Sequence, residues 1–85
     1  MYDKMCIDTF LERQEQLFYE PVAQTPEEAE EFLEDCMAYV CKNIREVRAY
    51  FEEVGIDIAG MSNEELAAAQ EVFDLPDGRY LIVEG

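Results

Sequence analysis

The stretch "EVFDLPDGRYLIV", residues 71–83, decides the fold class predicted for this 85-residue chain. Its flanks, "EVFDL" and "RYLIV", are rich in residues that favour β-strands. Between them, "LPDGR" is a strong turn signal, because proline presets one backbone angle and glycine accepts a positive φ angle. The stretch therefore predicts a β-hairpin over about 71–83. A lone hairpin is marginal in water, so it must pack on helices or pair with another copy.

Two helices are predicted from apolar spacing and capping residues. The first covers about 3–19 and ends before Pro21, which disfavours helix in the residue before it. Its apolar stripe consists of Ile7, Phe10, Leu11, Leu17 and Phe18, with Gln14 in the same stripe. The other is short, covers about 63–70, and begins with the capping box "SNEE" after Ser62 as N-cap.

A third, long helix is predicted over 26–54, with Thr25 as N-cap, Pro26 in the first helical position and Gly55 as C-terminal cap. Seven apolar residues in this range alternate steps of four and three, which is a heptad pattern: Leu33, Met37, Val40, Ile44, Val47, Phe51 and Val54. The predicted fold class is therefore α+β. One small domain over 1–85 would contain three helices with a long central helix, followed by the C-terminal β-hairpin.

The net charge and the hydrophobic content of the chain limit the classes of partner that it can bind. Twenty-one acidic residues against 6 basic ones give a net charge of −15, so nucleic acids and anionic membranes are poor direct partners. A basic protein surface is the partner that such a charge favours. Because 49% of the residues are hydrophobic and 12% aromatic, the chain should fold rather than act as a disordered acidic tail.

The sequence has few of the residues that catalysis or metal binding requires. The chain contains no histidine, which rules out Ser–His and Cys–His nucleophile pairs and histidine metal sites. Cys6, Cys36 and Cys41 are too few for a tetrahedral zinc site, and we expect Cys36 to be a buried structural thiol. We therefore expect no enzyme, no metal and no cofactor. The odd number of cysteines and the N-terminal "MYDKMCIDTF", which does not read as a signal peptide, predict a cytoplasmic protein.

The run "TPEEAEEFLEDC", residues 25–36, contains six acidic residues and no basic one. Acids in a first helical turn are favoured by the helix dipole, so a solvated helix start is the simpler interpretation. However, a small domain needs a charge of only about 2–8 for solubility, which favours a binding role for the excess. The predicted binding residues are Glu27, Glu30, Glu31, Glu34 and Asp35. If the short helix over 63–70 and the hairpin turn fold alongside, Glu64, Glu65, Asp74 and Asp77 extend this surface.

In composition, size and the run "PEEAEEFLED", the chain resembles the small acidic DNA-mimic inhibitors of phages and mobile elements, such as anti-restriction and anti-CRISPR proteins. The resemblance implies a non-catalytic inhibitor that fills the basic groove of a nuclease or another DNA-binding protein. The alternative is a small oligomerising scaffold or an antitoxin-like partner without nucleic-acid mimicry. The heptad pattern and the exposed hairpin edge favour that alternative, and they also predict a homodimer.

Overall fold

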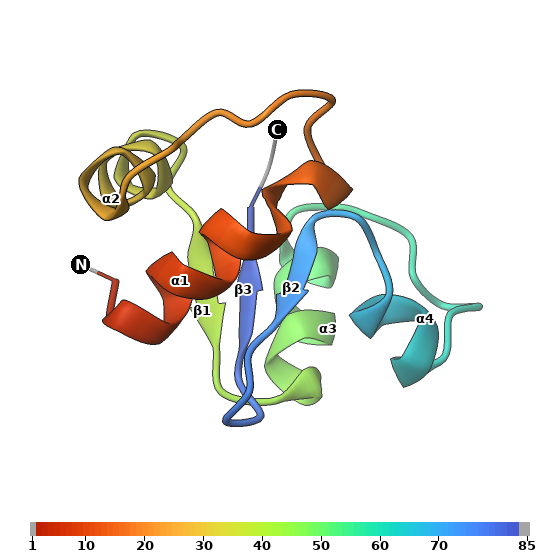
Figure 1. Cartoon of the computed structure of the whole chain (residues 1–85). Coiled ribbons are helices and arrows are strands. Elements are labelled where there is room, and N and C mark those ends of the chain that lie inside the picture. Colours follow the sequence, from red (N-terminus) through yellow and green to blue (C-terminus); the bar gives the residue numbers. More distant parts are fainter. Residues whose placement is uncertain (1, 84–85) are drawn as a thin grey trace.

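The computed structural model describes residues 2–83 and has an α+β fold, as predicted (Figure 1). The elements follow one another in the order α1 (Lys4–Arg13), the 3-10 helix η1 (Gln14–Gln16), α2 (Pro26–Asp35), β1 (Tyr39–Cys41), α3 (Ile44–Glu53), α4 (Asn63–Ala67), β2 (Val72–Asp74) and β3 (Tyr80–Ile82). The three strands form one antiparallel sheet in the order β1-β3-β2, so the last strand of the chain lies in the middle.

The predicted hairpin is confirmed. In β2 and β3, Phe73 lies opposite Leu81. The turn is closed by a hydrogen bond from the Leu75 amide to the Arg79 carbonyl at 2.9 Å. Gly78 takes a φ of +92°, the left-handed conformation for which the sequence supplied a glycine.

Strand β3 separates two hydrophobic clusters, because neighbouring side chains of a strand point to opposite faces. The first cluster joins α1 and α2 to one face of the sheet and contains Cys6, Ile7, Phe10, Ala23, Ala29, Leu33, Phe73, Leu75, Leu81 and Val83. The second joins α3 and α4 to the other face and contains Cys41, Val47, Phe51, Ile58, Leu66, Val72 and Ile82. The result is a layered arrangement, with α1 on one side of the sheet and α3 on the other (Figure 1).

The prediction of one helix over 26–54 is wrong. Helix α2 ends at Asp35, and Met37 follows in the left-handed conformation with a φ of +57°. Hydrogen bonds from the Met37 amide to the Glu34 carbonyl and from the Ala38 amide to the Leu33 carbonyl complete a Schellman termination. The chain then forms β1. A new helix, α3, starts after Asn43, whose side chain accepts a hydrogen bond from the Glu46 amide.

The heptad pattern was a coincidence of spacing across three separate elements. Leu33 belongs to the first cluster and Val47 to the second, so they do not share one helix face. Met37 is 82% exposed, and Val40 lies in a strand, where the side-chain period is two. The helix stop came from a non-glycine residue in the left-handed conformation, which is uncommon and gives no clear sequence signal.

The other two helices are shorter than predicted. Helix α1 ends at Arg13 and continues only as η1, because the buried Gln14 side chain turns inward to fasten the following loop. Its Nε2 donates to the Ala23 carbonyl at 2.8 Å, and its Oε1 accepts from the Val22 amide at 2.7 Å. Helix α4 begins after the Ser62 capping box, as predicted, and ends at Ala67.

The outer edge of β2 is partly occupied by side chains of the N-terminal helix. Arg13 Nη1 donates to the Asp74 carbonyl at 3.1 Å, and Gln16 Nε2 donates to the Val72 carbonyl at 2.9 Å. Bonded carbonyls are less able to template another strand. Neither feature behind the expected homodimer is present as the sequence suggested, and self-association stays a prediction for sedimentation analysis.

The left-handed Met37 generates a stability prediction. Replacing it with glycine removes the steric cost of this conformation, about 1–2 kcal/mol, against about 0.5–1 kcal/mol of extra glycine entropy. Because Met37 is largely exposed, little packing is lost. We expect Met37→Gly to raise the melting temperature by a few degrees. Met37→Ala, which keeps the Cβ atom, should give no such gain, and a melting temperature lowered by Met37→Gly would contradict this account.

Candidate binding surface on helix α2

The acidic run forms α2 and presents its carboxylates outward. Ala29 and Leu33 are fully buried against the first cluster and fix which side of the helix faces the core. The remaining sides carry all six acidic residues of the helix: Glu27, Glu28, Glu30, Glu31, Glu34 and Asp35. Five of these are exposed and Glu30 is half-buried. The five α2 residues predicted from the sequence are therefore brought together on one ten-residue helix.

These carboxylates form no ion pair within the described part of the chain. Helix α2 contains no basic residue. The ion pairs found among residues 2–83 join Lys4 to Asp8 and Arg79 to both Asp3 and Asp77, and none of them includes a residue of α2. Five of the six carboxylates also make no hydrogen bond with the described residues. No direct ion pair with the described residues therefore neutralises these carboxylates.

Glu28 is the exception and belongs to the start of the helix. Thr25 Oγ1 accepts a hydrogen bond from the Glu28 amide at 3.2 Å, as the N-cap prediction required. The Glu28 carboxylate, in turn, accepts from the Gln24 amide at 2.9 Å, one residue before the N-cap position that a capping box would use. Capping and the helix dipole thus explain Glu28 without any partner.

The acids in the second half of α2 oppose helix formation. Glu34 and Asp35 lie in the last turn, where the helix dipole is negative and favours basic residues instead. Like charges four positions apart also repel, by about 0.2–0.5 kcal/mol per pair. Such pairs are Glu27 with Glu31, Glu30 with Glu34, and Glu31 with Asp35. Helix formation therefore does not account for this half of the run.

A hollow of about 310 Å³ lies beside α2 and combines carboxylates with apolar side chains. Glu28, Glu31 and Asp35 line it together with Val22 and Phe32. An arginine side chain fits such a lining, because its stem packs on apolar groups while its guanidinium bonds carboxylates. Glu28 was not included among the binding residues predicted from the sequence. Glu28 precedes Glu31 by three positions and Asp35 by seven, a spacing that places the three side chains on one face of a helix.

The proposed extension of this surface is not formed as one patch. Helix α4, with Glu64 and Glu65, packs with α3 and lies at the opposite end of the molecule from α2 (Figure 1). Asp74 ends β2 and Asp77 lies in the hairpin turn, also away from α2 in Figure 1. The four residues named for the extension are thus separated from the five on α2.

Asp77 has a local structural role. It accepts a hydrogen bond from the Arg79 amide, and its Oδ2 pairs with Arg79 Nε at 2.6 Å. These bonds hold the pKa of the Asp77 carboxyl below its usual value. The same guanidinium reaches Asp3 Oδ2 at 2.8 Å and so ties the hairpin turn to the start of α1.

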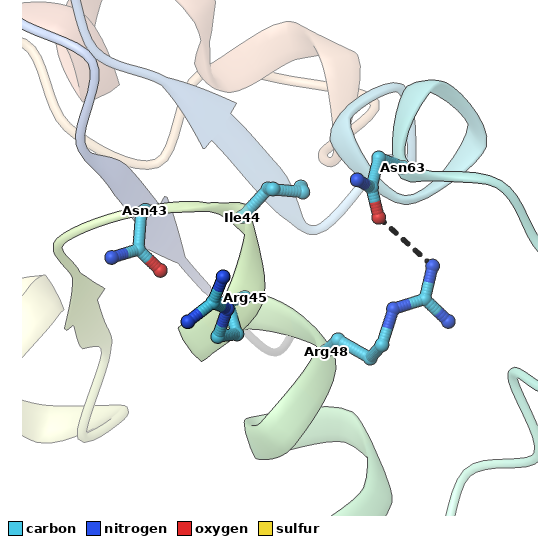
Figure 2. A pocket seen from close by; sticks show the side chains of 5 residues that line it. All are labelled: Asn43, Ile44, Arg45, Arg48 and Asn63. Carbon is cyan, nitrogen blue, oxygen red and sulfur yellow. Dashed lines mark hydrogen bonds between the residues drawn. The ribbon is translucent and has the colours of Figure 1, made fainter.

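Two arginines, Arg45 and Arg48, line a pocket of about 510 Å³ at the start of α3 (Figure 2). Its lining residues are Asn43, Ile44, Arg45, Arg48 and Asn63. Arg48 Nη2 donates to Asn63 Oδ1 at 2.9 Å and to the Met61 carbonyl at 3.0 Å, which fastens α4 to α3. Since α3 and α2 pack on opposite faces of the sheet, Arg45 and Arg48 belong to a different part of the surface from the α2 carboxylates.

Metal and thiol chemistry is not favoured by the described residues. Among residues 2–83, no group of three His, Cys, Asp or Glu side chains could hold a metal ion. Cys6, Cys36 and Cys41, all among the described residues, form no disulfide bond. Burial raises the pKa of both Cys6 and Cys41 to about 11. Cys36, expected to be buried, is half-buried, and its Sγ donates to the Leu33 carbonyl at 3.6 Å.

Comparison of the chain with protein-family models, with curated proteins and with solved structures found no match. Among residues 2–83 there is also no helix with the length and apolar character needed to cross a membrane. Function is therefore inferred from the charges and shapes of the described surface.

Different burial of the three thiols predicts different reactivity. Near pH 8, a thiol-specific reagent should modify the half-buried Cys36 faster than the buried Cys6 and Cys41, since a thiol must be accessible and ionised to react and burial raises the pKa of both Cys6 and Cys41 to about 11. Quantitative labelling should give one fast thiol in the native protein and three in denaturant. Cys36→Ser should abolish the fast phase. Equal rates for all three thiols in the native state would contradict the burial of Cys6 and Cys41.

Proposed function

We propose that this chain is a non-catalytic binding protein whose α2 face occupies the basic, nucleic-acid-binding groove of another protein. One observation carries the proposal: α2 holds acidic residues that oppose its own formation and have no ion-pair partner among the described residues. Natural proteins accept such local costs mainly where a function requires them. A basic partner would relieve the repulsion that the free protein endures.

The charge density of α2 is comparable to that of a nucleic acid. Its ten residues span about 15 Å and carry six carboxylates. Duplex DNA carries about one charge per 1.7 Å of axis, so the two densities are of the same order. Carboxylates three and four positions apart on a helix are about 5–6 Å from one another at their Cβ atoms. Lys and Arg side chains of a partner, positioned to bind the phosphates of a nucleic acid, could therefore bind the carboxylates of α2 instead.

Binding would use two physical effects. Long-range attraction between α2 and a basic groove would speed encounter. At short range, arginine side chains of the partner would make charge-assisted hydrogen bonds, for example in the hollow beside Glu31 and Asp35. Occupying the groove would block nucleic acid and so make this protein an inhibitor of its partner.

The oligomerising scaffold is the weaker alternative. It rested on a heptad face over 26–54, which the chain does not form, and on a hairpin edge that Arg13 and Gln16 partly cover. Charge reversal on α2 distinguishes the two, because a scaffold that assembles through apolar contacts would tolerate it.

The proposal predicts that Glu31→Lys, Glu34→Lys and Asp35→Lys together abolish partner binding without unfolding the protein. The measurement is capture of host proteins on the immobilised chain at low salt, followed by elution with duplex DNA. The native chain should retain a DNA-binding protein that the duplex displaces, and added salt should weaken retention steeply. The triple variant should retain none of it.

A matched variant controls for net charge. Glu12→Lys, Glu15→Lys and Glu20→Lys change the charge by the same amount at exposed positions outside α2. This control should retain the partner nearly as well as the native chain. If the α2 variant binds the partner as tightly as the native chain, or if duplex DNA fails to displace it, the proposal is wrong.

A further inference from the structure

A second hollow, of about 480 Å³, lies between β1 and α3. It is lined by Tyr39, Glu46, Ala49, Tyr50, Glu53 and Val54. The α3 members follow one another at positions i, i+3, i+4 and i+7, so they form one stripe along that helix. No sequence prediction involved this stripe, because it depends on β1 lying beside α3.

Two tyrosine rings form the aromatic part of this groove. The rings of Tyr39 and Tyr50 are stacked, with centroids 5.0 Å apart and an interplanar angle of 22°. Tyr50 is half-buried and packs against the second cluster, whereas Tyr39 is 47% exposed. Val54, 46% exposed, continues the apolar surface. Exposed aromatic and aliphatic groups lying together are typical of binding surfaces.

Carboxylates flank the aromatic pair. Glu46 is half-buried, and its Oε1 accepts a hydrogen bond from the Lys42 amide at 2.8 Å, which fixes this carboxylate at one end of the stripe. Glu53 is exposed at the other end and makes no hydrogen bond or ion pair with the described residues. The groove therefore offers π faces and negative charge to the same ligand group.

We propose that this groove binds an arginine side chain of a partner protein. A guanidinium can stack on the exposed face of Tyr39 and extend the existing tyrosine pair, while its N–H groups bond the Glu53 carboxylate. Its aliphatic stem can lie along Ala49 and Val54. Lysine fits less well, because a strongly hydrated ammonium stacks poorly and cannot bond a carboxylate with two parallel N–H groups. The net charge of −15 also favours a cationic ligand.

This groove is independent of α2. It uses residues of β1, of α3 and of the α3 C-cap Val54, so a failure of the α2 proposal leaves it standing, and the reverse holds as well. If both are correct, the groove anchors one arginine in a defined orientation while α2 supplies diffuse attraction.

The test is a titration of the full chain, followed by NMR, with two capped tripeptides: Gly-Arg-Gly and its citrulline analogue. Citrulline has nearly the shape of arginine but no charge. The arginine peptide should shift the ring signals of Tyr39 and Tyr50 in a saturable way, and the citrulline peptide should not. Glu53→Gln should weaken binding about two- to fivefold, the size expected for one exposed ion pair. Tyr39→Leu should weaken it by a similar factor through the lost cation–π contact.

Matched controls separate a built groove from general attraction. Glu52→Gln removes a neighbouring exposed charge outside the groove and should leave the affinity unchanged, as should Tyr19→Ser, since Tyr19 is 99% exposed elsewhere. The Glu31→Lys, Glu34→Lys, Asp35→Lys variant should keep the tyrosine shifts. If Glu52→Gln and Glu53→Gln weaken binding equally, or if shifts spread over all acidic segments without saturation, the groove is not an arginine site.

Discussion

Burial of β3 on both faces is the constraint on which the rest of the structure depends. Its neighbouring residues Leu81 and Ile82 point into different hydrophobic clusters, so each face of the strand requires its own cover of helices. Helices α1 and α2 cover one face, and α3 and α4 cover the other. The polypeptide must cross from one face to the other between α2 and α3, and β1 makes that crossing. A single long helix through this region would have left one face of β3 in water.

This arrangement explains why α2 can carry so much charge. The helix is held along one stripe by Ala29 and Leu33, and its end is fastened by the Tyr2 hydroxyl, which donates to the Leu33 carbonyl at 3.1 Å and to the Ala38 carbonyl at 2.5 Å. These contacts fix the helix without using any of its acidic side chains. The core therefore sets the orientation of α2, and core packing does not constrain the residues at its outward positions. The cost is electrostatic repulsion within the helix. Its free energy is small compared with the free energy gained by burying the apolar side of the helix.

Local chemistry predicted the local elements. The "LPDGR" turn, the Thr25 and Ser62 caps and the outward face of the acidic run were all readable, because each depends on a few neighbouring residues. The break after Asp35 was not readable, because Met37 stops the helix in a conformation that sequence usually marks with glycine. Strand β1 is only three residues long, too short for an alternation pattern to show. The Tyr39–Tyr50 groove and the distance of Glu64 from α2 follow from tertiary packing, which residue spacing does not contain.

We propose that the acids in the second half of α2 oppose folding and serve partner binding instead. The most direct test is the melting temperature of Glu34→Lys beside that of Glu27→Lys, measured at low and at high salt. Lysine at position 34 suits the helix dipole and relieves repulsion, so Glu34→Lys should raise the melting temperature by a few degrees at low salt. Glu27→Lys, at the opposite end of the helix, should raise the melting temperature by less or should lower it. Both changes in melting temperature should become smaller at high salt. A melting temperature lowered by Glu34→Lys at low salt would show that the acidic run stabilises the fold, and the claim would be wrong.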